Sequence, residues 1–188
     1  MLAIQNVTSR VEHWLRCREK RCCFDSAVFV TGADVALIAR TVSVPPWAFT
    51  SLLAAQPDAD DGFALDASGQ RWRLALRRVQ FPDEDAHCAF LLRFASGNTR
   101  CGLGGVRPGA CRVFPLEGGS ETCVCAWSGV ALDDAATRDE VAQLASDRDH
   151  YAGVVRAWNA YVKQNGEMRF QHEDFCRFLL DAYAEAGR

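Results

Sequence analysis

Cysteines gathered in two separate blocks place the strongest constraint on how this chain can fold. Six of the nine cysteines lie in these blocks, Cys17, Cys22 and Cys23 upstream and Cys88, Cys101 and Cys111 downstream. Thiolates are soft ligands that suit zinc and iron–sulfur clusters, and a metal can join residues that are far apart in the chain. The pattern therefore predicts that folding brings both blocks together around a metal.

The length, composition and charge of the chain indicate what kind of protein carries these thiols. The chain has 188 residues, 49% apolar and 24% charged, so it can form a real hydrophobic core. We expect one domain over residues 1–188, with a metal-binding cysteine core over 1–130 and a helical extension over 131–188. The net charge of −3 gives no reason to expect nucleic acid as a partner. No apolar run approaches the ~20 residues of a membrane span, so we expect no membrane partner either.

Whether the nine cysteines form disulfides or bind metal depends on the cellular compartment. The first residues lack the charged and apolar regions of a secretory signal, so we expect a cytoplasmic protein. Stable disulfides are disfavoured in the cytoplasm, and the odd number of cysteines also argues against a complete disulfide framework. Many thiols in such a chain indicate metal binding or catalysis.

Helical and strand-like patterns alternate before the downstream block. The expected elements are a helix over 3–16, a strand over 27–30, a helix opened by the capping-box pair Thr31 and Asp34, and a short helix from Pro46 that carries Trp47, Phe49, Leu52 and Leu53. The first helix leads directly to Cys17, and the strand follows the Cys22-Cys23 pair.

Three β-hairpins are expected next, over 63–77, around a turn at 96–98, and around a turn at 117–121. From about residue 134 the pattern is helical. The expected features there are a capping box at Thr137 and Glu140, a helix from Tyr151 to Gln164, and a last helix over 173–185. The predicted fold class is α+β, with small β-hairpins and surrounding helices around a cysteine-held metal site, and a helical C-terminal third.

Arginines and turn residues accompany the downstream thiols. Four thiolates on a zinc ion or a 4Fe–4S cluster leave a formal charge of about −2, which needs compensation when it is partly buried. Arg100, Arg107 and Arg112 alternate with the cysteines and could supply that compensation. The intervening glycines allow backbone N–H groups to turn toward sulfur, and Pro108 stiffens the turn before Cys111.

The downstream block reads Cys88-Ala-Phe-Leu91, Cys101-Gly-Leu103 and Arg107-Pro-Gly-Ala-Cys111-Arg-Val-Phe-Pro115. In spacing and in most side chains it resembles the zinc- or iron-chelating cysteine-cluster family of the C-x-x-C-x-x-C-C, or YkgJ, type. The Cys22-Cys23 pair, followed by an apolar strand and a helix with an early Asp34, is also similar to this family. The resemblance implies metal binding by cysteines, with zinc, mononuclear iron and an iron–sulfur cluster all open.

Two more cysteines, Cys123 and Cys125, fall on the return arm of the third predicted hairpin. Strand alternation turns both toward the same face, so they could be ligands or could pack as small apolar residues. His87 precedes Cys88 and could supply nitrogen, although alternation favours a surface position for it. His172 is expected to be solvated or to cap a helix. Cys176, away from other thiols on an amphipathic helix, is expected to be ordinary packing.

These residues support three hypotheses of function. The leading one is a metal-binding protein that holds zinc or iron, as a single ion or as 4Fe–4S. Its candidate ligands are Cys17, Cys22, Cys23, Cys88, Cys101, Cys111, Cys123 and Cys125. They could serve two four-ligand sites or one site with spare thiols.

The resemblance extends to the cysteine-rich region of the longer flagellin lysine N-methylases. It thus implies part of a protein-modifying enzyme as an alternative, although the chain has no glycine-rich nucleotide fingerprint. The third hypothesis is a thiol redox or metal-storage module, because Cys22-Cys23 and Cys123-Val-Cys125 are close pairs. The sequence identifies neither a catalytic residue nor a protein partner.

Overall fold

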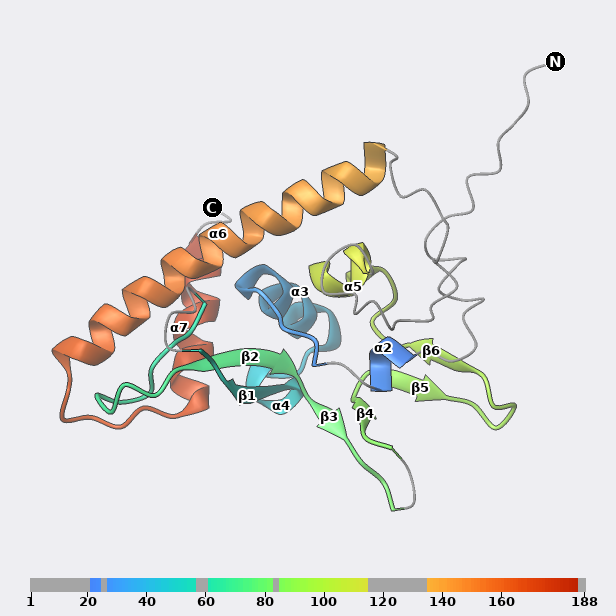
Figure 1. Ribbon diagram of the computed structural model, residues 1–188, viewed down its shortest axis with the longest axis horizontal. Helices are drawn as coiled ribbons and strands as arrows, with labels where there is room; N and C mark the ends of the chain where they lie inside the picture. The colour runs from blue at the N-terminus through green and yellow to red at the C-terminus, as the bar shows by residue number, and fades with distance from the viewer. Residues whose placement is uncertain (1–20, 25–26, 57–60, 83–84, 115–134, 186–188) are drawn as a thin grey trace.

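One long helix crosses the molecule, and most other elements lie on one side of it (Figure 1). This helix is α6, Ala135–Gln164, and it packs against α3, Gly32–Val42, α5, Gly109–Val113, and α7, His172–Glu185. The computed structural model describes residues 21–24, 27–56, 61–82, 85–114 and 135–185. Within them the chain has the mixed architecture that the sequence predicts, with helices, small antiparallel strand pairs and a helical C-terminal third.

The strands form three separate antiparallel pairs. These pairs are β1, Thr50–Ala54, with β2, Trp72–Leu76; β3, Arg78–Val79, with β4, His87–Cys88; and β5, Leu91–Arg93, with β6, Thr99–Cys101. The predicted strand before α3 also contacts the first pair, because Phe29 bridges Ala75 and the Val30 N–H donates to the Leu74 carbonyl at 3.1 Å. The predicted hairpin with its turn at 96–98 is confirmed as β5–β6.

The structure corrects the prediction for the segment after Pro46. The predicted helix ends early, since α4 covers only Pro46–Phe49 and β1 begins at Thr50. Strand β2 therefore takes β1 as its main partner, while the predicted pairing within 63–77 reduces to the single bridge Phe63–Trp72. Leu52 and Leu53 satisfy a helical pattern and a strand pattern equally well, and backbone pairing with β2 favoured the strand.

Local sequence signals explain most helix boundaries. Thr31 and Asp34 form the predicted capping box, in which the Thr31 side chain accepts the Asp34 N–H and the Asp34 side chain accepts the Thr31 N–H. The structure confirms the end of α6 at Gln164, where the Asn165 N–H donates to the Tyr161 carbonyl at 3.1 Å. The capping box at Thr137 is wrong, because α6 has already begun at Ala135.

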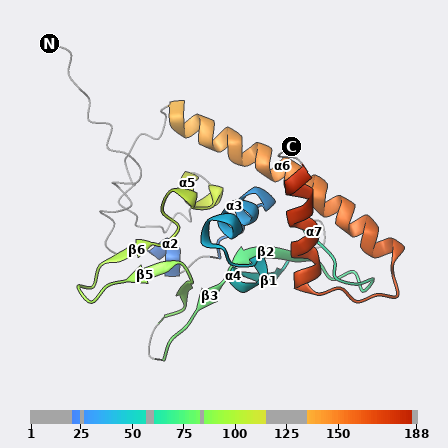
Figure 2. The ribbon, with the colours of Figure 1, turned by 180° about the vertical axis from the view of Figure 1, so that it is seen from behind.

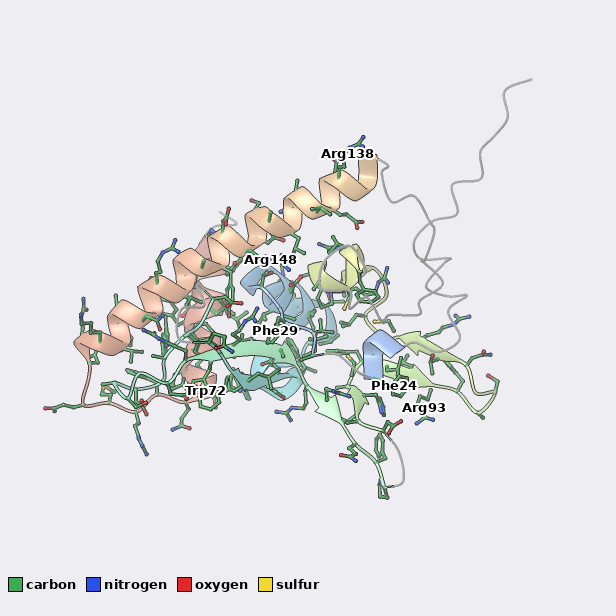
Figure 3. All side chains as sticks on the ribbon, viewed as in Figure 1. Phe24, Phe29, Trp72, Arg93, Arg138 and Arg148 are labelled. Carbon is green, nitrogen blue, oxygen red and sulfur yellow. The ribbon has the colours of Figure 1, made fainter. Side chains whose placement is uncertain are left out.

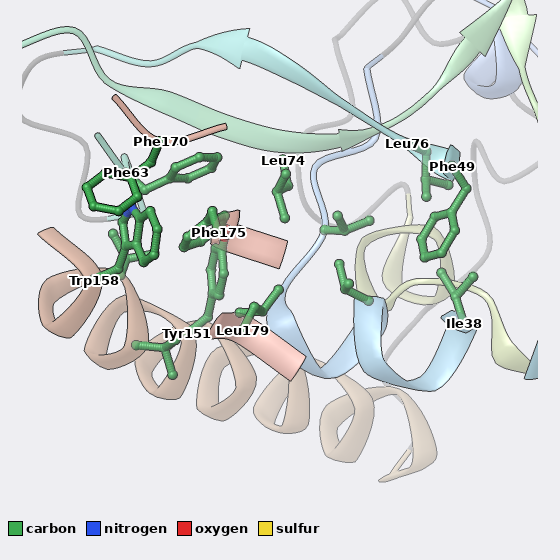
Figure 4. Close-up of a cluster of buried hydrophobic side chains, with 14 of the residues drawn as sticks. Ile38, Phe49, Phe63, Leu74, Leu76, Tyr151, Trp158, Phe170, Phe175 and Leu179 are labelled. Carbon is green, nitrogen blue, oxygen red and sulfur yellow. The ribbon is translucent and has the colours of Figure 1, made fainter. Parts of the chain in front are cut away.

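Aromatic side chains from three segments form the centre of the core (Figure 4). Trp158 of α6 is 2% exposed, and its ring contacts the rings of Phe170 and Phe175 at centroid distances of 5.2 and 5.5 Å. Phe63 stacks on Phe175 at 3.7 Å. The Trp158 indole N–H also donates to the Ala64 carbonyl at 2.6 Å, so the one polar atom of the ring is satisfied.

Several predicted elements cannot be compared with the structure. The helix over 3–16, the turn at 117–121 and Cys17, Cys123 and Cys125 lie outside the described residues. Among the helices that the structure does describe, none has both the length and the apolar character needed to cross a lipid bilayer.

Replacing Trp158 with alanine is expected to lower the free energy of unfolding by about 3–5 kcal/mol, because the ring fills the centre of the aromatic cluster. Urea denaturation followed by circular dichroism measures this change. Met168→Ala serves as the control, since Met168 is 51% exposed and its truncation should change stability by no more than about 0.5 kcal/mol. Equal losses in the two variants would contradict this account of the core.

His172 is expected to make the free energy of unfolding depend on pH. Its Nε2 lies 3.0 Å from the Thr50 hydroxyl, and that hydroxyl donates its own proton to the Pro46 carbonyl at 2.8 Å. Burial, with a smaller contribution from Arg77, lowers the pKa of His172 below its ordinary value of 6.5. The unfolded chain therefore binds more protons as the pH falls, so stability is complete above about pH 6.5 and decreases below it.

Urea midpoints measured between pH 8 and pH 5 test this linkage. The wild-type midpoint is expected to fall as the pH decreases through 6.5, and His172→Gln should lose less stability over the same range. Identical pH profiles for the two proteins would show that His172 does not contribute.

Candidate metal centre

Four of the predicted ligands have described side chains, and each lies on a different small element. Cys23 is on α2, Arg21–Phe24, Cys88 on β4, Cys101 on β6 and Cys111 on α5. Figures 1 and 2 show α2, β4, β5, β6 and α5 gathered away from the end of the molecule where α6 joins α7. Cys88 belongs to the buried hydrophobic cluster, and Cys23 and Cys101 pack against that same cluster. Each of these three thiols therefore contacts the hydrophobic core.

The Arg78 side chain joins the upstream cysteine block to the downstream one. Its Nη2 donates to the carbonyl oxygen of Phe24, at the end of α2, and to that of Ala86, just before β4. Arg78 is also the register partner of Cys88 in the β3–β4 pair. One guanidinium thus holds the Cys22-Cys23 helix against the Cys88 strand and places a positive charge between them. The sequence around Arg78 gives no signal of this role, because only the fold brings its side chain to both segments.

His87 is buried, which corrects the surface position expected from strand alternation. It is 3% exposed, and its ring centroid lies 5.7 Å from that of Phe24, which Figure 3 labels, and 6.0 Å from that of Phe81. Both faces of this two-residue strand are covered, so alternation does not decide exposure here. The His87 Nδ1 lies 3.2 Å from the Asp85 carbonyl. A carbonyl only accepts, so in the neutral ring this contact favours the tautomer with the proton on Nδ1, whose Nε2 offers a metal its lone pair.

A tight turn follows Cys101. Cys101 pairs with Leu91 across the β5–β6 hairpin, and the next amide, that of Gly102, donates to the Phe90 carbonyl at 2.7 Å. Leu103 then enters the core with 4% exposure, and Gly104 takes a φ of +51° that favours glycine. These contacts fix the backbone on both sides of the Cys101 thiol.

Cys111 lies in the middle of the short helix α5. The preceding Pro108 starts this helix, and its carbonyl accepts the Cys111 N–H at 2.9 Å and the Arg112 N–H at 3.0 Å. The amide of Gly109 donates to the Asp34 carboxylate of α3 at 2.8 Å. Burial raises the pKa of Asp34, while its hydrogen bonds and the nearby Arg112 act in the opposite direction.

The three arginines predicted to surround the thiols have different environments. Arg100 is exposed on β6, next to Cys101, whereas Arg107 and Arg112 are half-buried beside Cys111. The Arg112 side chain reaches back to the Arg107 carbonyl, with its Nη1 at 3.4 Å. These arginines adjoin the thiols in sequence, and their compensation of the charge of a metal site stays a prediction.

The described side chains do not by themselves complete a metal site. Within the described part of the chain, no three Cys, His, Asp or Glu side chains lie close enough together to hold an ion. The side chain of Cys22 and the whole of Cys17, Cys123 and Cys125 lie outside the described residues, so half of the eight predicted ligands cannot be placed. The ligand set stays a prediction.

Cys176 behaves as the sequence predicts, as a packed core residue. It is fully buried on α7, and its thiol is hydrogen-bonded to Thr50. Burial raises the pKa of Cys176 to about 12, so the thiolate is scarcely formed at neutral pH. This thiol is therefore suited neither to nucleophilic chemistry nor to metal binding.

Comparisons of the chain with models of protein families, with curated proteins and with solved structures found no match. The resemblance to the cysteine-cluster family therefore remains a prediction from the motif itself.

Gly109→Ala is expected to displace α5 from α6, because a Cβ at this position would lie 2.7 Å from Cδ1 of Leu144, which is 1% exposed. The free energy of unfolding should fall by about 1–3 kcal/mol, as measured by urea denaturation. Gly105→Ala is the matched control in the same segment, since a Cβ there meets no atom within 4 Å. A Gly109→Ala protein as stable as the control would contradict the close approach of the two helices.

Proposed function

We propose that this protein is a cytoplasmic metal-binding protein in which thiolates from both cysteine blocks hold zinc or iron, either as a single ion or as a 4Fe–4S cluster. The observation that carries the proposal is the position of Arg78, which joins α2 to the strand that begins at His87. The proposal needs the Cys22-Cys23 segment to meet the Cys88 segment, and this contact supplies that proximity across more than 50 residues of sequence.

The chemistry of the donors supports zinc or iron. Cys23, Cys88 and Cys101 are soft sulfur donors from separate elements, and His87 adds an imidazole whose Nδ1 is bonded to a carbonyl, as is common for metal-binding histidines. At least one further donor is needed, since the described side chains alone do not surround an ion. Cys17, Cys22, Cys111, Cys123 and Cys125, the other predicted ligands, are the candidates for it.

The positive charges of this region favour thiolates over thiols. A site with four thiolates has a formal charge of about −2, and such a charge is costly unless cations or N–H donors lie nearby. Arg78 lies between the two blocks, and Arg107 and Arg112 lie beside Cys111. When bound, the metal would supply folding free energy, about 10 kcal/mol or more for a structural zinc site.

Metal analysis of protein purified without oxygen tests the proposal. We expect zinc or iron in an amount near one site per chain, and acid-labile sulfide with visible absorption bands if the site is a cluster. Cys23→Ala and Cys88→Ala should each lose most of this metal. Cys176→Ala is the matched control and should keep it, because Cys176 is a fully buried thiol on α7, outside both cysteine blocks.

Two results would contradict the proposal. One is a wild-type protein that is fully folded, contains no metal and takes up neither zinc nor iron. The other is equal metal content in Cys88→Ala and Cys176→Ala, which would show that the downstream block does not hold the metal.

A further inference from the structure

Asp34 has a buried carboxylate that accepts hydrogen bonds both at the start of α3 and from α5. The side chain is 5% exposed, and its Oδ2 accepts hydrogen bonds from the backbone N–H and the hydroxyl of Thr31, at 2.9 and 3.0 Å. Its other oxygen, Oδ1, accepts the backbone N–H of Gly109 at 2.8 Å. The first two bonds lie within the capping box of α3, whereas the third spans 75 residues of sequence.

The bond to Gly109 is not needed to cap α3. The capping box is complete with Oδ2 alone, because its reciprocal bond runs from the Asp34 N–H to the Thr31 hydroxyl. The second oxygen, Oδ1, therefore makes a tertiary contact that joins α3 to α5. The two carboxylate oxygens accept all three hydrogen bonds, whereas an asparagine here would turn an N–H group toward one set of donors.

Two residues that interact with Asp34 stand on either side of Cys111, one of the predicted metal ligands. Gly109 stands two positions before Cys111, and Arg112, whose charge acts on Asp34, stands one position after it. Helix α5 has only five residues, so it is too short to be stable without tertiary contacts. Its described anchors are the Asp34 carboxylate on one side and the packing of Gly109 against Leu144 of α6 on the other.

We propose that Asp34 is a positioning residue for the metal centre: by binding the Gly109 amide it fixes the backbone of Cys111 against α3, and so slows the release of a metal held by that thiol. This inference rests on the proposed function, but the anchoring of α5 can be measured without a metal. The role proposed for Asp34 is not that of a ligand, because among the described residues it belongs to no group of three possible ligands and its oxygens bond to N–H and hydroxyl donors.

Asp34→Asn tests this role, with Thr31→Val as the matched control. Thr31→Val removes the hydroxyl and weakens the same capping box, but it leaves the Asp34–Gly109 hydrogen bond in place. The first readout is amide hydrogen exchange in metal-free protein, at Arg112 in α5 and at Val155 in α6 as an internal reference. The second is the rate at which zinc-loaded protein releases zinc to a chromogenic chelator.

We expect Asp34→Asn to raise the exchange rate of the Arg112 amide, relative to that of Val155, by about tenfold, the effect of losing one charge-assisted hydrogen bond. Zinc release should accelerate by a similar factor. Thr31→Val should leave both quantities within about twofold of wild type, because the lost bond lies outside the α3–α5 contact.

Three outcomes overturn the inference. They are an unchanged exchange ratio in Asp34→Asn, an equal change in Thr31→Val, and faster exchange without faster zinc release. If wild-type protein holds no zinc or iron at all, the proposed function fails, while the exchange ratio still decides whether Asp34 anchors α5. Should Asp34→Asn not fold, Asp34→Glu replaces it, because the longer side chain keeps the charge but displaces the carboxylate from Gly109.

Discussion

The burial of Trp158 is the interaction on which the rest of the structure depends. Its ring lies between Phe170 and Phe175, and its N–H is bonded to the Ala64 carbonyl. Burial of so large an apolar surface is the main favourable contribution to folding. The contacts of this one side chain therefore hold three segments against α6: helix α7, the segment before α7, and the chain before β2. Helix α6 then provides the surface on which α3 and α5 are placed.

The cysteine-bearing elements are attached to this core by a few specific contacts. Asp34 holds α5, Arg78 joins α2 to the segment before β4, and the β5–β6 hairpin places Cys101 against the hydrophobic cluster. Each of these elements has five residues or fewer, so none would be stable alone. In the proposed function, a metal would add cross-links at the end of the molecule where the elements are shortest.

Local chemistry made a good part of the fold predictable. The capping box at Thr31, the turn before Thr99 and the end of α6 at Gln164 each depend on residues close together in sequence. The errors arose where local signals were ambiguous. Thr50–Ala54 is a strand because β2 pairs with it, and His87 is buried because Phe24 and Phe81 cover it. Neither partner can be identified from the neighbouring residues.

The sequence by itself determined the kind of site to look for: thiols in two blocks, with turn residues and arginines around the second block. It also determined the start of α3 at the Thr31 capping box and the end of α6 at Gln164, because caps and turns act over three or four positions. Only the tertiary structure decided that Arg78 joins α2 to the Cys88 segment, and that Asp34 binds Gly109. These contacts span 54 and 75 residues, and they exist because packing around α6 brings their partners within hydrogen-bonding distance.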